Sequence, residues 1–180
     1  MGDIDGALIP AVYFDWLRRG TTGLLEQVFE HNVLDLVSMA ALIAELARRV
    51  ELVQDDDAAE DCLSLAELSW RAGDELRAES LALLAAERAG TGQTAFDAWC
   101  FAAKLGARRR DWPATASRLE LALRLHGIEP EALEEAHLAL ARVLEHRLKD
   151  RPRALRHAQL GARAEPAGEN ARRQARLTPV

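Results

Sequence analysis

The feature that most constrains the fold is a helical pattern that breaks at regular intervals in the C-terminal two thirds of the chain. The breaks fall at Ala72-Gly73-Asp74, Arg110-Asp111-Trp112 and Lys149-Asp150-Arg151, so that the three aspartates are 37 and 39 residues apart. A recurrence of this length is typical of solenoids, in which each unit buries its apolar stripe only against its neighbours. The sequence therefore predicts about three helix-turn-helix units stacked into a short superhelix.

Small residues recur in the helix that follows each break, where a neighbouring helix must come close. They are Ala78 and Ala85, then Ala116 and Ala122, then Ala154 and Ala158. This pattern resembles the tetratricopeptide repeat, and the residues that carry the match are Gly73, Ala78 and Ala85 in the first copy, Trp99 and Trp112 in the second, and Ala154 and Pro166 in the third. The resemblance implies tetratricopeptide-like hairpins over residues 58–168, with a concave surface for a protein or peptide, and we expect residues 169–180 to form a frayed tail.

The composition indicates an all-α protein. Ala, Leu, Arg and Glu dominate, only 5% of the residues are aromatic, and Val and Ile are sparse. Those residues favour helix, whereas strands are enriched in β-branched and aromatic residues. The sequence has no Asn-Gly pair, and its Asp-Gly pair, Asp5-Gly6, is not flanked by alternating apolar and polar residues, so it gives no hairpin signal. We therefore expect few strands or none.

Charge and cysteine content exclude several classes of protein. A net charge of −6 argues against a protein whose main role is non-specific binding of a polyanion. The basic runs Arg108–Arg110 and Arg172, Arg173 and Arg176 are interpreted as solvated helix ends rather than phosphate contacts. Cys62 and Cys100 lack zinc-ligand spacing and are expected to be buried reduced thiols. With neither a signal peptide nor a membrane-spanning run, the protein is predicted to be cytoplasmic.

The N-terminal region, residues 1–53, differs from the repeats. A short segment, AVYFDWLRR, is punctuated by Gly and Pro, and a long helix is predicted from Leu24 to Val50 with Thr21 or Thr22 as its cap. Such a short segment is marginal alone, so Tyr13, Phe14 and Trp16 must pack on something. The acidic patch DDDAAED at residues 55–61 marks the boundary with the repeats.

His31 and Asp35 lie four residues apart in the long predicted helix and therefore project from one face. Three interpretations are open. The pair can be an ordinary surface pair, or part of a transition-metal site, although two ligands do not complete a coordination shell. It can also be the last part of a two-metal nuclease site, with Asp binding a divalent ion and His acting on the attacking water.

Two segments resemble the end of the ribonuclease-H-like exonuclease domain of YprB-type bacterial proteins. Ile9, Pro10, Tyr13, Phe14, Leu17, Arg18 and Gly20 fit a segment of the form I-P-x-x-Y-F-x-x-L-R-x-G, and His31, Asn32, Asp35 and Ser38 fit the helix motif H-N-x-x-D-x-x-S. Such proteins also carry a helical, tetratricopeptide-like tail. By analogy with DEDD-type 3′–5′ exonucleases, the resemblance implies that Asp35 is the last metal-binding carboxylate and His31 the general base, with Asn32 and Ser38 supporting.

The resemblance leaves the metal site incomplete. A two-metal site of this class needs further carboxylates from a sheet that precedes the matching segment, and Asp3, Asp5 and Asp15 do not lie in strand-like runs. Mg²⁺ or Mn²⁺ is expected only if the full site is assembled, because these ions need several oxygen ligands. Residues 1–53 are therefore predicted to be the C-terminal helices of a truncated ribonuclease-H-like domain, inactive alone.

Two functions follow as hypotheses. The chain is the C-terminal portion of a metal-dependent 3′–5′ exonuclease, whose missing half belongs to a longer chain or to another chain and whose substrate is nucleic acid. Alternatively, it is a free-standing interaction module that binds a protein or peptide on its repeats, with His31 and Asp35 inert. Of the remaining candidates, His126, His137, His146 and His157 are assigned to packing or capping rather than to ligand binding. Trp70, Trp99 and Trp112 are interpreted as anchors of the repeat core rather than as stacking platforms for bases.

Overall fold

A computed structural model of the chain describes residues 4–20, 22–52 and 57–178. It divides into two compact units, residues 1–54 and 55–180. The described residues form helices and turns and contain no β-strand, which confirms the all-α prediction. None of the helices in these ranges is both long and apolar enough to cross a membrane. The predicted boundary at residue 53 lies outside the described residues.

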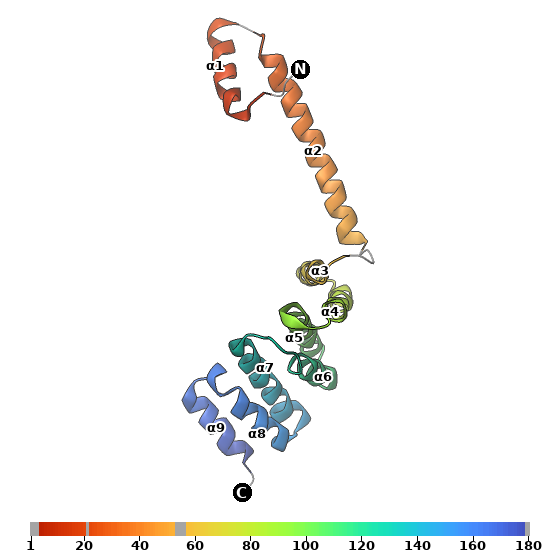
Figure 1. Ribbon diagram of the computed structural model, residues 1–180, viewed down its shortest axis with the longest axis vertical. Helices are drawn as coiled ribbons and strands as arrows, with labels where there is room; N and C mark the ends of the chain where they lie inside the picture. The colour runs from red at the N-terminus through yellow and green to blue at the C-terminus, as the bar shows by residue number, and fades with distance from the viewer. Residues whose placement is uncertain (1–3, 21, 53–56, 179–180) are drawn as a thin grey trace. The chain divides into compact units, whose positions relative to one another are not determined.

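Unit 1 consists of a short 3₁₀ turn, η1 (Gly6–Leu8), and two helices, α1 (Ile9–Arg19) and α2 (Leu25–Glu51) (Figure 1). Gly20 ends α1 with a left-handed backbone at φ +68°, a conformation that glycine adopts without steric cost. The predicted long helix is confirmed to within one residue at each end. Its expected threonine side-chain cap was wrong for Thr22, whose backbone carbonyl accepts the Leu25 N–H at 3.0 Å, and Thr21 lies outside the described residues.

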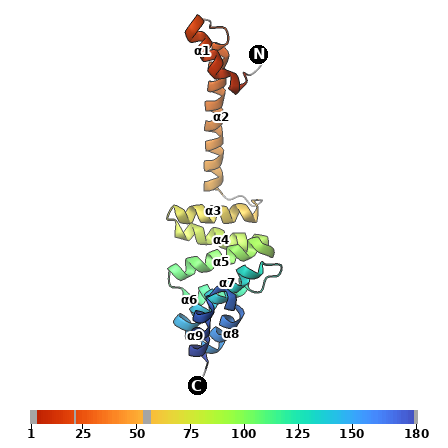
Figure 2. The ribbon, with the colours of Figure 1, turned by 90° about the vertical axis from the view of Figure 1, so that its left-hand side faces the viewer.

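Unit 2 contains three successive helical hairpins. They are α3 (Ala59–Arg71) with α4 (Glu75–Ala89), α5 (Gly92–Arg108) with α6 (Trp112–Ala122), and α7 (Pro130–Val143) with α8 (Arg151–Leu160). Consecutive helices pack against one another along the whole series. Figure 2 shows that the turns inside the three hairpins lie on the same side of the stack. The predicted hairpins are therefore present, while the tetratricopeptide assignment stays a prediction.

The three predicted turn aspartates all cap the second helix of a hairpin. Asp74, Asp111 and Asp150 accept the backbone N–H three residues later, at 3.0, 3.1 and 3.2 Å. Their backbones are almost identical, with φ between −82° and −88° and ψ of 79° or 80°. Each side chain thus satisfies a helix N–H that has no partner inside the helix.

The residue before each aspartate has a left-handed backbone, which reverses the chain. It is Gly73 in the first turn but Arg110 and Lys149, at φ +60° and +61°, in the others. In the first two turns the aspartate N–H donates a hydrogen bond to the carbonyl five residues earlier. In the third turn the Asp150 N–H donates to the Leu144 carbonyl, six residues earlier. The extra residue belongs to a π-helical turn, η2 (Leu144–Leu148), so the third hairpin departs from the other two at this point.

The core of unit 2 is rich in alanine, as the sequence predicts. The six alanines at the predicted contact positions, Ala78, Ala85, Ala116, Ala122, Ala154 and Ala158, are all buried. Small side chains allow the helices to approach closely, so that leucines such as Leu105, Leu140 and Leu144 fill the remaining space. The packing therefore depends on backbone proximity more than on large apolar side chains.

The expectation of a frayed tail was wrong. After a 3₁₀ turn, η3 (Ala162–Ala164), the chain forms helix α9 (Ala167–Leu177), which packs on α8. Asn170, Arg173 and Leu177 are buried, and the Asn170 amide donates to the Ala158 carbonyl at 3.1 Å. The basic run is thus not wholly solvated, because Arg173 and Arg176 both bind Glu145.

Candidate functional site

His31 and Asp35 project from one face of α2, as their spacing predicts. The distance from His31 Nε2 to Asp35 Oδ2 is 3.4 Å. The His31 side chain is 19% exposed, whereas that of Asp35 is 63% exposed. The pair therefore places a proton-accepting imidazole beside an accessible carboxylate, an arrangement that either an ordinary surface pair or a catalytic pair would show.

Asn32 and Ser38 lie on α2 three residues before and three residues after Asp35. Ser38 is exposed and follows Asp35 by three residues, so it lies on the same side of α2 as the pair. Asn32 lines a cavity of about 910 Å³ between α1 and α2, whose other walls are largely apolar and include Tyr13, Trp16 and Phe29. Helical spacing thus puts both Asn32 and Ser38 within one turn of Asp35, and Asn32 also lines the cavity between α1 and α2.

The described residues do not by themselves fit a divalent metal ion. Across these residues there is no group of three or more His, Cys, Asp or Glu side chains that could hold a metal. Asp5 caps η1 by accepting the Ala7 N–H, and Asp15 pairs with Arg19 at 3.2 Å. Asp3 lies outside the described residues. Asp35 could contribute one carboxylate to a site, but Mg²⁺ and Mn²⁺ need several oxygen ligands.

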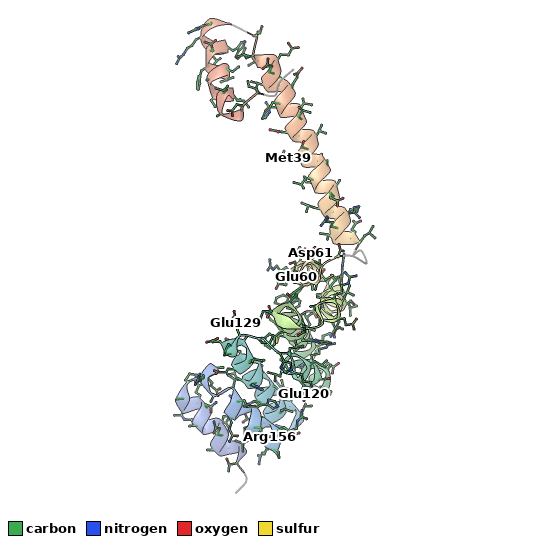
Figure 3. All side chains as sticks on the ribbon, in the orientation of Figure 1. Met39, Glu60, Asp61, Glu120, Glu129 and Arg156 are labelled. Carbon is green, nitrogen blue, oxygen red and sulfur yellow. The ribbon has the colours of Figure 1, made fainter. Side chains whose placement is uncertain are left out.

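Helix α2 is apolar around much of its circumference and is almost uncovered within unit 1. Val28 is its one buried residue among those described. Large apolar side chains along the rest of the helix are 40–66% exposed, and Met39 projects away from it (Figure 3). They are Phe29, Val33, Leu34, Leu36, Val37, Met39, Leu42, Ile43, Leu46 and Val50. A helix that is hydrophobic all round is normally buried in a larger core.

Unit 2 carries a groove of about 500 Å³ between α5, α6 and α7. Its walls include Phe96, Ala136 and Val143, with Asp97 and Lys104 among the polar lining residues. Cys100 also lines it, and burial raises the pKa of this thiol to about 12, with a smaller contribution from the Asp97 carboxylate. The thiol therefore stays protonated at neutral pH and is not an activated nucleophile. Cys62 and Cys100 are both free thiols, and Cys62 is fully buried.

The structure pairs two histidines that the sequence analysis treated as separate packing residues. His137 on α7 and His157 on α8 bring their Nδ1 atoms to 2.9 Å, so one nitrogen donates and the other accepts. Burial lowers the pKa of both imidazoles, and for His157 the charges of His137 and Arg153 act in the same direction. No local spacing in the sequence signals this contact, because the two residues come from different helices.

The three tryptophans contact side chains of neighbouring helices, but all three are half-buried and none belongs to the fully buried core. Trp70 meets Phe101 edge to face at 5.7 Å between ring centroids, and the ammonium of Lys104 lies 4.5 Å from its ring. The guanidinium of Arg147 lies 4.5 Å from the Trp112 ring. Trp99 packs beside the buried cluster that contains Phe96. Near the turns of the hairpins, Lys104 thus lies against the face of the Trp70 ring and Arg147 against the face of the Trp112 ring.

Comparison with known proteins bears on unit 1. A family model described as the RNase H superfamily matches residues 1–47, about a quarter of the chain. The match includes α1, most of α2, and all four residues of the predicted site. No curated protein matches the chain. The N-terminal 47 residues are therefore similar to the RNase H superfamily, in a segment that ends within α2.

Proposed function

We propose that unit 1 is the C-terminal part of an RNase H-like 3′–5′ exonuclease domain of the YprB type, and that the chain acts on nucleic acid once the rest of that domain is present. The remainder would come from a longer form of this polypeptide or from another chain. The match to the RNase H superfamily over residues 1–47 supports the class of domain. The 3′–5′ exonuclease reaction and the roles of His31 and Asp35 are our proposal.

The observation that carries the proposal is the uncovered apolar surface of α2. Ten large apolar side chains on this helix are about half exposed. Burying such a side chain completely is worth about 1.5–3 kcal/mol, so covering the exposed halves of all ten would contribute on the order of 10 kcal/mol. That free energy is what the missing sheet of an RNase H-like domain would gain by packing on α2.

In the assembled domain, Asp35 would supply one of several carboxylates for Mg²⁺ or Mn²⁺, and His31 would be the general base. Asn32 and Ser38 would support them. The His31–Asp35 distance of 3.4 Å and the exposure of the carboxylate are compatible with these roles. With one carboxylate in place, unit 1 alone is expected to bind these ions weakly.

The test begins with the native product. An antibody against residues 60–180 would isolate the protein from its source cells, and its mass would be compared with 19.8 kDa. The isolated protein would then be assayed with Mn²⁺ on single-stranded DNA and RNA labelled at the 5′ end. We expect a heavier species, or a stable complex, that shortens the strand from its 3′ end.

Variants expressed in the same cells identify the residues. Asp35→Asn should abolish degradation, and His31→Gln should slow it by about 10²–10⁴-fold, as expected for loss of a general base. Asp15→Asn on α1 is the matched control and should retain activity. A native species of 19.8 kDa without nuclease activity, or full activity in Asp35→Asn, would refute the assignment.

The groove on unit 2 favours a second function, a tetratricopeptide-like module that binds a peptide. It is open, about 500 Å³ in volume and mostly apolar, with Lys104 and Glu135 available to orient a ligand. Ala139 also lines the groove, so Ala139→Trp should fill it and abolish binding of any native peptide partner. If that partner binds wild type and Asp35→Asn equally but not Ala139→Trp, the module is the function of this unit.

A further inference from the structure

Basic side chains gather at the turns inside the three hairpins of unit 2. These turns lie on the same side of the stack because consecutive antiparallel helices reverse direction (Figure 2). With neighbouring helix axes about 8–10 Å apart, successive turns are spaced roughly 16–20 Å. We name this side the turn edge. Its basic residues are Arg71, Arg77, Lys104, Arg108, Arg109, Arg110, Arg147, Lys149 and Arg151.

Six of these cations make no ion pair with any residue in the described part of the chain. Arg71, Arg108 and Arg109 are paired, with Glu67, Glu75 and Glu79 respectively. The others are Arg77, Lys104, Arg110, Arg147, Lys149 and Arg151, so that at least one unpaired cation belongs to every hairpin.

The acidic residues at the turns are occupied by other contacts. Asp74, Asp111 and Asp150 accept backbone N–H groups as helix caps, and Asp150 also lies 3.5 Å from Arg153. Glu145, beside the third turn, binds Arg173 and Arg176. A hydrogen bond from a backbone N–H leaves the carboxylate charged, so the three cap aspartates still count as −3, and the six unpaired cations exceed them by three.

Two of the unpaired cations are held in place by aromatic rings. Lys104 lies over Trp70 and Arg147 over Trp112. Arg110 and Lys149 occupy the left-handed positions of their turns, where the chain reverses and the side chain is exposed. Cations whose stems are already ordered lose less conformational entropy on binding an anion.

The opposite edge, where one hairpin connects to the next, is mainly acidic, although Arg88 and Arg124 also lie there. It carries Glu60 and Asp61 at the start of α3 and Glu129 before α7, all labelled in Figure 3. Glu131, Glu134 and Glu135 follow in the first turns of α7. The net charge of −6 thus conceals a separation of charge across unit 2.

From this charge separation we infer that the turn edge of unit 2 binds the phosphate backbone of a single-stranded nucleic acid, one hairpin turn after another. The inference rests on the proposed function, because nucleic acid is the substrate class of an RNase H-like nuclease. Repeated cations at regular spacing suit a polymer with one charge per nucleotide, and binding through phosphates is independent of sequence. The groove of α5–α7 shares Lys104 with the turn edge, but its apolar walls are not part of the proposed phosphate-binding surface.

The test measures binding of a fluorescein-labelled thymidine oligonucleotide of about 20 nucleotides to the full chain, in EDTA, as a function of salt. For a single strand, each phosphate contact contributes about −0.7 to the slope of log K against log salt concentration. Six contacts therefore give a slope near −4. Affinity should then fall about 250-fold when salt rises fourfold. EDTA keeps any metal site out of the measurement.

The variant Arg77→Ala/Arg110→Asn/Lys149→Asn removes one cation from each turn. Asn is chosen at residues 110 and 149 because it tolerates the left-handed backbone better than most residues. A second variant, Lys104→Ala/Arg147→Ala/Arg151→Ala, alters no left-handed position. Each should weaken binding at least tenfold and reduce the slope to about −2.

The matched control, Arg124→Ala/Arg163→Ala/Arg172→Ala, makes the same change in net charge away from the turns and should bind within twofold of wild type. Equal losses in the control and the turn variants, no binding of wild type at low salt, or equally tight binding of a polyglutamate peptide would each overturn the inference. Asp35→Asn, which tests the proposed function, is left out of this binding assay. Its effect on degradation is measured separately, so the proposed function and this inference can fail independently.

Discussion

The stability of α9 should depend on one buried arginine. Arg173 is 8% exposed, and its Nη2 and Nε atoms donate to the two carboxylate oxygens of Glu165 at 2.7 and 3.1 Å. Its Nη1 donates to Glu145. The Glu165 side chain is 1% exposed, and its other partner is Arg142, at 3.2 Å, whose side chain is 53% exposed. One guanidinium thus joins α9 to two carboxylates outside that helix.

Arg173→Met keeps the length of the side chain but removes its charge. Glu165 is then left as a buried carboxylate with Arg142 alone. Removing one partner of a buried ion pair costs about 3–5 kcal/mol, and because Arg142 remains we expect a loss of about 3 kcal/mol. This is a large share of the roughly 5–15 kcal/mol by which a domain is normally stable.

Urea unfolding followed by circular dichroism at pH 7 measures this loss, with Arg172→Met as the control, since Arg172 is an exposed neighbour on the same helix. The double variant Arg173→Met/Glu165→Met should regain most of the stability, because replacing both partners of a buried pair by apolar residues is nearly neutral. Hydrogen exchange would show whether residues 170–177 open separately from the rest of unit 2. A loss in Arg173→Met within about 0.5 kcal/mol of that in Arg172→Met would refute the reasoning, since surface substitutions vary by that much.

Two further predictions concern the packing of α8 on α7. An ideal Cβ at Gly161 would lie 2.6 Å from the Glu134 carbonyl oxygen and 2.7 Å from the Leu138 nitrogen, so Gly161→Ala should destabilise unit 2 by about 1–3 kcal/mol in urea unfolding. Gly168→Ala, with no atom within 4 Å of its Cβ, should be neutral or stabilising by up to about 1 kcal/mol, and equal effects of the two substitutions would contradict the packing argument. Burial lowers the pKa of His137, so the unfolded chain binds more protons below the ordinary histidine pKa of about 6.5, and stability should fall as pH drops from that value toward the lower pKa of the folded protein. Urea unfolding between pH 7 and about 5 measures this dependence. His137→Gln should make stability less dependent on pH, and the exposed His126→Gln is the control. An unchanged pH dependence in His137→Gln would show that His137 is not its cause.

Local sequence was sufficient to predict the hairpins. A helix cap acts within three residues and a helical turn within four, so Asp74, Asp111 and Asp150 mark the same turn wherever the repeats lie in space. The alanines of the second helices were predictable for a similar reason, because helical periodicity identifies the buried face. The proximity of His31 and Asp35 also followed from spacing alone, since both residues belong to one helix.

Contacts between distant segments depended on the tertiary structure. The segment that forms α9 is polar and rich in arginine, so by composition it looked like a fraying tail. It is ordered because Arg173 meets Glu145 and Glu165, which lie 28 and 8 residues away, and no local period indicates those partners. His137 and His157 meet for the same reason, across two helices 20 residues apart in sequence.

The sequence by itself thus determined the long helix α2, the helices of the three hairpins, where the hairpins turn and which faces are apolar, because these properties arise from hydrogen bonds and side-chain spacing within a few residues. The tertiary structure alone decided which charged and titratable side chains become buried partners. It also placed the basic turns on one side of unit 2 and the acidic connections on the other. Those outcomes depend on how successive helices stack, and an interaction between stacked helices is not encoded in the spacing of either helix.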